Sequence, residues 1–134
     1  MINFEKYMDI SFKEKGRDLS GLDCYGLIYI FFKNELGIIL PDFLEVKYHG
    51  DWSKKGEDHI LENIPNTFNK VVDSEFKKFD LHLFFDSTGI ASHVGMNIGN
   101  GKFLHINEGS YSRISNLGIY KRLLYGTLRY RFNA

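Results

Sequence analysis

The second half of the chain is a succession of strand-like segments, and this succession constrains the fold more than any other feature. After about residue 67, short stretches rich in β-branched and aromatic residues alternate with turn residues: 68–72, 81–85, 93–98, 102–107, 111–114 and 124–130. Asn100-Gly101 separates two of these stretches, and this dipeptide is typical of a tight β-hairpin turn. Helical patterns precede the strands. This order predicts an α+β fold, in which N-terminal helices pack on an antiparallel sheet of five to six strands.

One long helix is predicted from Cys24 to about Leu36, after a shorter one over 3–9. Asp23 is placed to cap the first turn of the long helix, and Gly37 follows its last turn, where glycine commonly ends a helix. Apolar residues form a wide stripe along it, so we expect this helix to be central and buried.

The composition indicates one domain, 1–134, with a core of its own, since 43% of the 134 residues are hydrophobic. The 17 basic and 17 acidic side chains cancel, which argues against nucleic acid or a charged membrane surface as a partner. No apolar run approaches the roughly 20 residues of a membrane span. The start of the chain lacks the basic and apolar regions of a secretory signal peptide. We therefore expect synthesis in the cytoplasm, and delivery by another route if the protein acts outside the cell.

Cys24 is the only cysteine, so it cannot form an internal disulfide bond. It is either a small buried hydrophobic residue or a reactive thiol. Its place at the start of a helix favours the reactive role, because the partial positive charge and unpaired N–H groups there stabilise a thiolate. The same N–H groups could receive the oxyanion that forms when the thiolate attacks a carbonyl group.

A cysteine hydrolase also needs a histidine that takes and returns a proton, and a group that orients this histidine. Among the five histidines, His49 and His59 are expected at the surface, and His82 is expected to face solvent or a helix edge. His93 and His105 flank the predicted hairpin and are the candidates for proton transfer. The alternative, that both are strand histidines satisfied by their neighbours, stays open at this point. Neither has a cysteine or carboxylate partner nearby in the sequence, so no metal site is expected, and no cofactor.

The hairpin turn decides whether these two histidines can meet. A regular two-residue Asn100-Gly101 loop would place residue 105 opposite Met96, with the imidazoles on opposite faces. A three-residue loop or a β-bulge would place residue 105 opposite Gly95, diagonal to His93. We predict the second arrangement, because His105 has to touch His93 to orient it. We also expect Gly95 to leave open space on this face that a substrate could occupy.

Two motifs together resemble the NlpC/P60 peptidases, which are bacterial cell-wall enzymes with a papain-like core. They are Asp23-Cys24-Tyr25-Gly26-Leu27 and the hairpin from His93 to His105. The resemblance implies that Cys24 is the nucleophile, His93 the general base and acid, and His105 the orienting third residue. It implies a cysteine endopeptidase that cleaves the stem peptides of peptidoglycan, at the bond between D-glutamate and the diamino acid that follows.

Two further stretches, Lys15-Gly16-Arg17-Asp18 and 34–41, resemble the branch of this family found in phage tails and tail-like particles. That resemblance implies tail proteins as partners, and delivery of the domain to the cell wall as part of such a particle.

Three positions beside the nucleophile bear on substrate binding. Phe12 stands where many family members carry a tyrosine whose hydroxyl helps to hold the oxyanion. Tyr25 stands where a serine is usual, and its bulk could narrow or reshape the pocket. Asp23 either recognises a free substrate amine or only caps the helix, and both interpretations stay open.

The polar stretch 42–66 is interpreted as a cover or rim, with a short helix around 57–63. Within it, Trp52 and Tyr48 either line the substrate groove or pack. Two alternatives to the endopeptidase remain: an amidase or transferase with the same Cys-His pair, and a structural tail or assembly module that has lost turnover. The absence of a hydroxyl at Phe12 favours the second of these alternatives.

Overall fold

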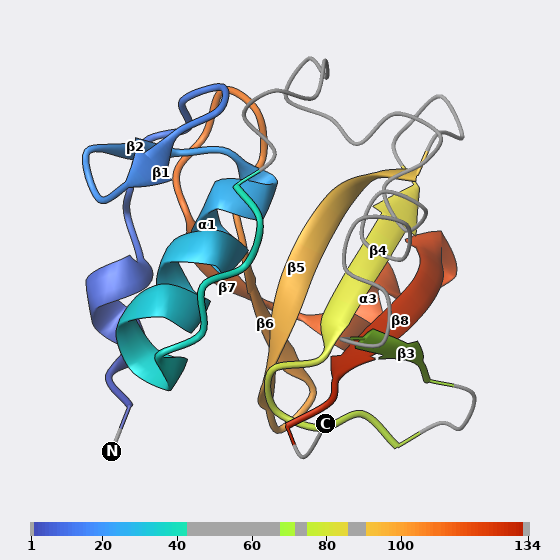
Figure 1. Cartoon of the computed structure of the whole chain (residues 1–134). Helices are drawn as coiled ribbons and strands as arrows, with labels where there is room; N and C mark the ends of the chain where they lie inside the picture. Colours follow the sequence, from blue (N-terminus) through green and yellow to red (C-terminus); the bar gives the residue numbers. More distant parts are fainter. Residues whose placement is uncertain (1, 43–67, 72–74, 86–90, 133–134) are drawn as a thin grey trace.

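The computed structural model describes residues 2–42, 68–71, 75–85 and 91–132, and in it the N-terminal helical segment lies on one side of a large sheet, with the short helix near residue 120 on the other side (Figure 1). The helical and short elements are η1 (Phe4–Tyr7), β1 (Arg17–Asp18), β2 (Gly21–Leu22), α1 (Cys24–Phe31), η2 (Phe32–Leu36), α3 (Leu117–Tyr120) and η4 (Lys121–Leu123). The main strands are β3 (Phe68–Lys70), β4 (Leu81–Phe85), β5 (Ala91–Gly99), β6 (Lys102–His105), β7 (Arg113–Asn116) and β8 (Leu124–Tyr130). The predicted helix at 57–63, together with His49 and His59, lies outside the described residues.

The large sheet has six strands in the order β3-β8-β4-β5-β6-β7, and every neighbouring pair is antiparallel. Helix α1 packs beside β5, near the middle of the sheet (Figure 1). The predicted α+β fold, with an N-terminal helix on an antiparallel sheet of five to six strands, is confirmed. None of the helices among the described residues has the length and apolar character that crossing a membrane requires.

The predicted helix from Cys24 to Leu36 is present, but only its first part, α1, is α-helical, and its last turn, η2, is wider than an α-helical turn. The Asp23 carboxylate accepts a hydrogen bond from the Gly26 N–H, which confirms Asp23 as the N-cap. From Phe32 to Leu36 the helix is of the π type, and the N–H of Gly37 bonds the carbonyl of Phe32, five residues earlier. Gly37 has φ 67°, a left-handed conformation that glycine adopts without strain.

Both faces of the sheet are covered by apolar side chains. On one face, residues of β4, β5 and β6 pack against α1 in the main core, which includes Leu27, Ile28, Phe31, Leu83, Val94, Met96 and Leu104. On the other face, Phe84 and Phe103 form a second cluster with Leu117 of α3. Residues that alternate with the main core along β4 and β5 are therefore buried as well.

The β5–β6 hairpin combines a two-residue turn with a bulge. Asn100 and Gly101 both have positive φ, 56° and 71°, as a type I′ turn requires. Gly99 pairs with Lys102, and the register then shifts between Asn97 and Gly99, so that Met96 pairs with Leu104. Continuing this register places residue 105 beside Gly95, as predicted.

Candidate active site

His93 and His105 meet across the β5–β6 hairpin. Nε2 of His93 lies 2.8 Å from Nδ1 of His105, and the two rings stand edge to face at 70°. The prediction that both imidazoles share one face of the sheet and touch is confirmed. The bulge produces this contact, because without it the side chain at position 105 would point to the opposite face.

Gly95 allows the two strands to approach closely at this point. A Cβ added there would lie 2.7 Å from Cδ2 of Phe103 and 3.1 Å from Cβ of His105. The open space that we expected beside Gly95 is thus filled by these two side chains, and the expectation of room for a substrate there was wrong. The glycine serves strand packing instead.

A third polar residue, Ser115 on β7, extends the histidine pair. Its Oγ lies 2.7 Å from Nε2 of His105, so the contacts run from His93 through His105 to Ser115. Ser115 pairs with Phe103 across β6 and β7, which places it diagonal to His105 on the same face. The sequence prediction missed Ser115 because the expected strand ended at residue 114.

Burial favours the neutral form of both imidazoles. Burial lowers the pKa of His93 to about 4, and the positive charge of Arg113 adds to this effect. Burial also lowers the pKa of His105 to about 3, with further contributions from His93 and then Arg113. A positive charge on His93 therefore requires a compensating negative charge close by.

Cys24 is the first residue of α1, and the chain before it is held firmly in place. The buried Asp23 carboxylate accepts hydrogen bonds from the Gly26 N–H (2.7 Å), the Lys15 N–H (2.9 Å) and the Arg17 guanidinium (2.9 Å). Figure 1 shows α1 beside β5, with the first residues of both elements toward the same end of the molecule. Cys24 opens the helix and His93 is near the start of the strand, so the fold brings the two segments to one region.

A sequence profile described as "NlpC/P60 family" matches residues 10–127. The chain belongs to the NlpC/P60 family. The family predicted from the motifs at Cys24 and His93 is thereby confirmed.

Individual relatives agree with this assignment. Murein DD-endopeptidase MepH of Escherichia coli K12 is 33% identical over 86 residues, which are 63% of this chain and 26% of MepH. The NlpC/p60 domain of the peptidoglycan hydrolase SagA has the same fold at 21% identity, with a TM-score of 0.62, over 93% of this chain and 91% of that one. NlpC1 of Trichomonas vaginalis is similar at 18% identity, with a TM-score of 0.68, over 94% of this chain and 41% of its own. The match thus spans about a quarter of the length of MepH. None of these three relatives gives evidence on an association with phage tails.

In this NlpC/P60 chain, Tyr25 is buried and does not line an open pocket. Its side chain is 1% exposed, and its hydroxyl donates a hydrogen bond to the carbonyl of Pro41 at 2.7 Å. The Arg17 guanidinium lies over its ring, with Cζ 5.4 Å from the ring centre. Tyr25 therefore ties the segment that follows α1 to the segment that precedes it.

Phe12 is half-buried against the main core, and its N–H donates to the carbonyl of Ser110 at 3.0 Å. Trp52 and Tyr48 lie outside the described residues, so their predicted place in a groove stays a prediction. Among the residues that the structure describes, no three histidine, cysteine or acidic side chains converge as metal ligands would.

His82 is buried, and the prediction that it faces solvent or a helix edge was wrong. Its Nδ1 lies 2.9 Å from Oγ1 of Thr127, and its Nε2 lies 3.1 Å from Nδ2 of Asn97. The residue points into the second apolar cluster, where the ring of Phe76 packs against it. Burial lowers the pKa of His82 to about 4, although the nearby Asp80 opposes this effect.

Proposed function

We propose that this chain is a cysteine endopeptidase that cleaves stem peptides of bacterial peptidoglycan. Cys24 acts as the nucleophile, His93 as general base and acid, and His105 as the residue that orients His93. The observation that carries the proposal is the 2.8 Å contact between His93 and His105, on the strand that packs beside the helix opened by Cys24. In a family of this kind, such a trio performs acyl transfer to a thiol.

The reaction begins with transfer of the Cys24 thiol proton to Nδ1 of His93, since Nε2 of His93 is engaged by His105. The thiolate attacks the carbonyl carbon of the substrate, and N–H groups at the start of α1 stabilise the oxyanion. His93 gives its proton to the leaving amine as the C–N bond breaks, which leaves a thioester on Cys24. Water then attacks the thioester and loses a proton to His93. The acid product departs and loses its remaining proton to the solvent, and His93 returns the first proton to the thiolate of Cys24.

The residues around the nucleophile have distinct tasks in this proposal. The fully buried Asp23 carboxylate accepts hydrogen bonds from three donors. These contacts favour a role in fixing the first turn of α1, and not in recognising a substrate amine. Because Phe12 has no hydroxyl, oxyanion stabilisation rests on the backbone N–H of Cys24. Tyr25 is buried, and its proposed role is to support the residues that form the wall of the site. Trp52 is proposed to line the groove.

The family resemblance implies that the cleaved bond is the one between D-glutamate and the diamino acid that follows it. The name of MepH, a DD-endopeptidase, favours a second candidate, a bond in the cross-bridge between stems. Association with a phage tail or tail-like particle rests on the motifs at 15–18 and 34–41 alone. Arg17 of the first motif binds Asp23, so this stretch also has a local role in supporting α1.

The experiment is digestion of purified peptidoglycan by the wild type and by Cys24→Ala, with mass analysis of the products. We expect the wild type to release new amino ends on the diamino acid and new carboxyl ends on D-glutamate, and Cys24→Ala to release none. New ends within the cross-bridge would select the second bond. Release of whole stem peptides from the glycan would indicate an amidase, and the absence of new ends with the wild type would indicate a structural module.

A further inference from the structure

We propose that Arg113 is a specificity-determining residue, which binds a free carboxylate that the D-glutamate of the stem peptide carries beside the cleaved bond. Glutamate has two carboxyl groups, and only one of them forms the bond to the diamino acid. The other one is therefore a carboxylate close to the carbonyl group that Cys24 attacks. The inference rests on the proposed function, because it names the substrate group that the same site recognises.

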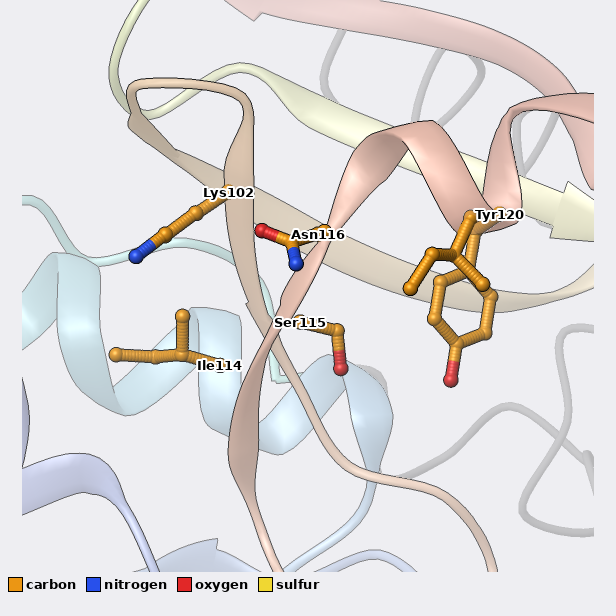
Figure 2. Close-up of a pocket in the computed structure, with 6 residues that line it drawn as sticks. Lys102, Ile114, Ser115, Asn116 and Tyr120 are labelled. Atoms are coloured by element: carbon orange, nitrogen blue, oxygen red, sulfur yellow. The ribbon is translucent and has the colours of Figure 1, made fainter.

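Strand pairing places Arg113, the first residue of β7, beside the two histidines. It pairs with His105 across β6 and β7, and residues directly opposite each other point to the same face of a sheet. Ile114, the next residue, packs on the main core, on the other face. Figure 2 shows this alternation for Ile114 and Ser115, which extend to opposite sides of β7. Arg113 therefore shares the face on which His105 contacts His93.

A series of contacts also connects Arg113 with the segment that precedes the nucleophile. Its Nη1 donates a hydrogen bond to Oγ of Ser110 at 3.3 Å. The carbonyl of Ser110 accepts a hydrogen bond from the Phe12 N–H at 3.0 Å, and Phe12 forms a parallel β-bridge with Leu22. Leu22 is two residues before Cys24. Arg113 is thus linked to both halves of the proposed catalytic unit, the histidine pair and the start of α1.

The Arg113 guanidinium has no acidic partner among the residues that the structure describes. Its side chain is half-buried, and its one hydrogen bond in that part of the chain is the long contact with Ser110. By contrast, Arg17 and Arg129 each form an ion pair with a buried aspartate. A guanidinium has five N–H donors in a fork that matches the two oxygens of a carboxylate. Arg113 is therefore suited to an anion that arrives with the substrate.

The charges that form during the reaction favour such an anion. Transfer of the thiol proton creates a thiolate on Cys24 and an imidazolium on His93, and these two charges balance each other. Arg113 adds a further positive charge, which lowers the pKa of His93 and of His105 in the same direction as burial. A substrate carboxylate bound to the guanidinium would offset this charge and so make His93 easier to protonate.

Lys102 is the other cation close to β7, and it lies apart from the histidine pair. Together with Ile114, Ser115, Asn116, Ile119 and Tyr120 it lines a pocket of about 310 Å³. Figure 2 shows Lys102 on the same side of the strands as Ile114, away from Ser115. Lys102 is exposed and begins β6, whereas His105 ends it. Lys102→Gln therefore removes one positive charge from the same pair of strands without changing the proposed contact.

The experiment uses two synthetic stem peptides that differ only at the free carboxyl group of D-glutamate, which is a carboxylate in one and a carboxamide in the other. We expect the wild type and Lys102→Gln to cleave the carboxylate peptide with a kcat/KM about tenfold higher or more, because the carboxamide cannot form the charge-assisted pair. Arg113→Gln should lower kcat/KM for the carboxylate peptide about tenfold and leave the carboxamide peptide within about threefold, so that the preference disappears.

Calorimetry with Cys24→Ala makes the same comparison without turnover. This variant should bind the carboxylate peptide about tenfold more tightly than the carboxamide peptide, and adding Arg113→Gln should make the two affinities equal. Equal affinities in Cys24→Ala, or no binding of either peptide, would overturn the proposal even if Arg113→Gln failed to fold. So would an Arg113→Gln protein that loses the same factor in kcat/KM on both peptides, since the guanidinium would then act on the thiolate or the oxyanion. A protein that binds the peptides with the expected preference and cleaves neither would instead contradict the proposed function.

Discussion

Replacement of Gly95 by alanine should force β5 and β6 apart where the two histidines meet. The new Cβ would lie 2.7 Å from Cδ2 of Phe103, well short of the 3.4 Å at which ordinary contact begins, and 3.1 Å from Cβ of His105. The Phe103 ring cannot move aside easily, because it is fully buried between Phe84 and Tyr120, with ring centres 5.0 and 5.3 Å away.

Overpacking of this kind destabilises a protein by about 2–3 kcal/mol, and the lower entropy of the unfolded alanine chain returns up to about 1 kcal/mol. We therefore expect Gly95→Ala to lower the free energy of unfolding by about 2 kcal/mol, and Tm by about 8 °C. The same displacement should separate His105 from His93 and lower kcat.

Urea denaturation gives the free energy of unfolding, and peptidoglycan digestion gives kcat. Gly118→Ala is the control, since its added Cβ would meet nothing within 4 Å. Gly118 lies in α3, where alanine is the better helix former, so this variant should be as stable as the wild type or up to about 1 kcal/mol more stable. Equal stability and kcat of Gly95→Ala and the wild type would refute the reasoning about this close approach.

Two further predictions concern buried charge. Arg17→Met leaves the buried Asp23 carboxylate without its guanidinium partner. Urea denaturation should therefore show that the free energy of unfolding falls by about 3 kcal/mol, and an unchanged urea midpoint would contradict this account. Folding should also weaken as the pH falls from 7 to 5, because an unfolded histidine binds a proton near pH 6.5 whereas folded His82 does so only near pH 4. His82 alone should account for a loss of about 2 kcal/mol in the free energy of unfolding between pH 7 and pH 5. His82→Gln should therefore reduce the slope of this free energy against pH, and an unchanged slope would contradict the role given to His82.

Local sequence patterns predicted the strands, the cap at Asp23 and the turn at Asn100-Gly101, because each depends on a few adjacent residues. The bulge was predicted by a chemical requirement, the contact of His93 with His105, and not by any pattern of its own. Turn residues alone do not define the register, since the same Asn-Gly turn is compatible with a regular or a bulged hairpin.

Two of the misses, His82 and Ser115, share a physical cause, which is contact with elements that the local pattern does not include. His82 alternates with apolar residues as a solvent-facing position would, yet α3 contributes Leu117 to a second cluster on that face of the sheet. Ser115 acquires its partner only through the pairing of β6 with β7. The Arg17–Asp23 pair has a different, local origin, because it depends on a short β1–β2 hairpin within a stretch that looked merely polar.

The central claim is that Cys24 and His93 act as one catalytic unit, and a double-mutant comparison tests it most directly. The measurement is kcat/KM for release of new amino ends from peptidoglycan by Cys24→Ala, His93→Ala and the double variant. Each single variant should lower kcat/KM by a factor of about a thousand or more. The double variant should lower kcat/KM no further than the less active of the two single variants, because the effects of residues that act as one unit are not additive. Losses that multiply in the double variant, or a single variant within tenfold of the wild type, would contradict the claim.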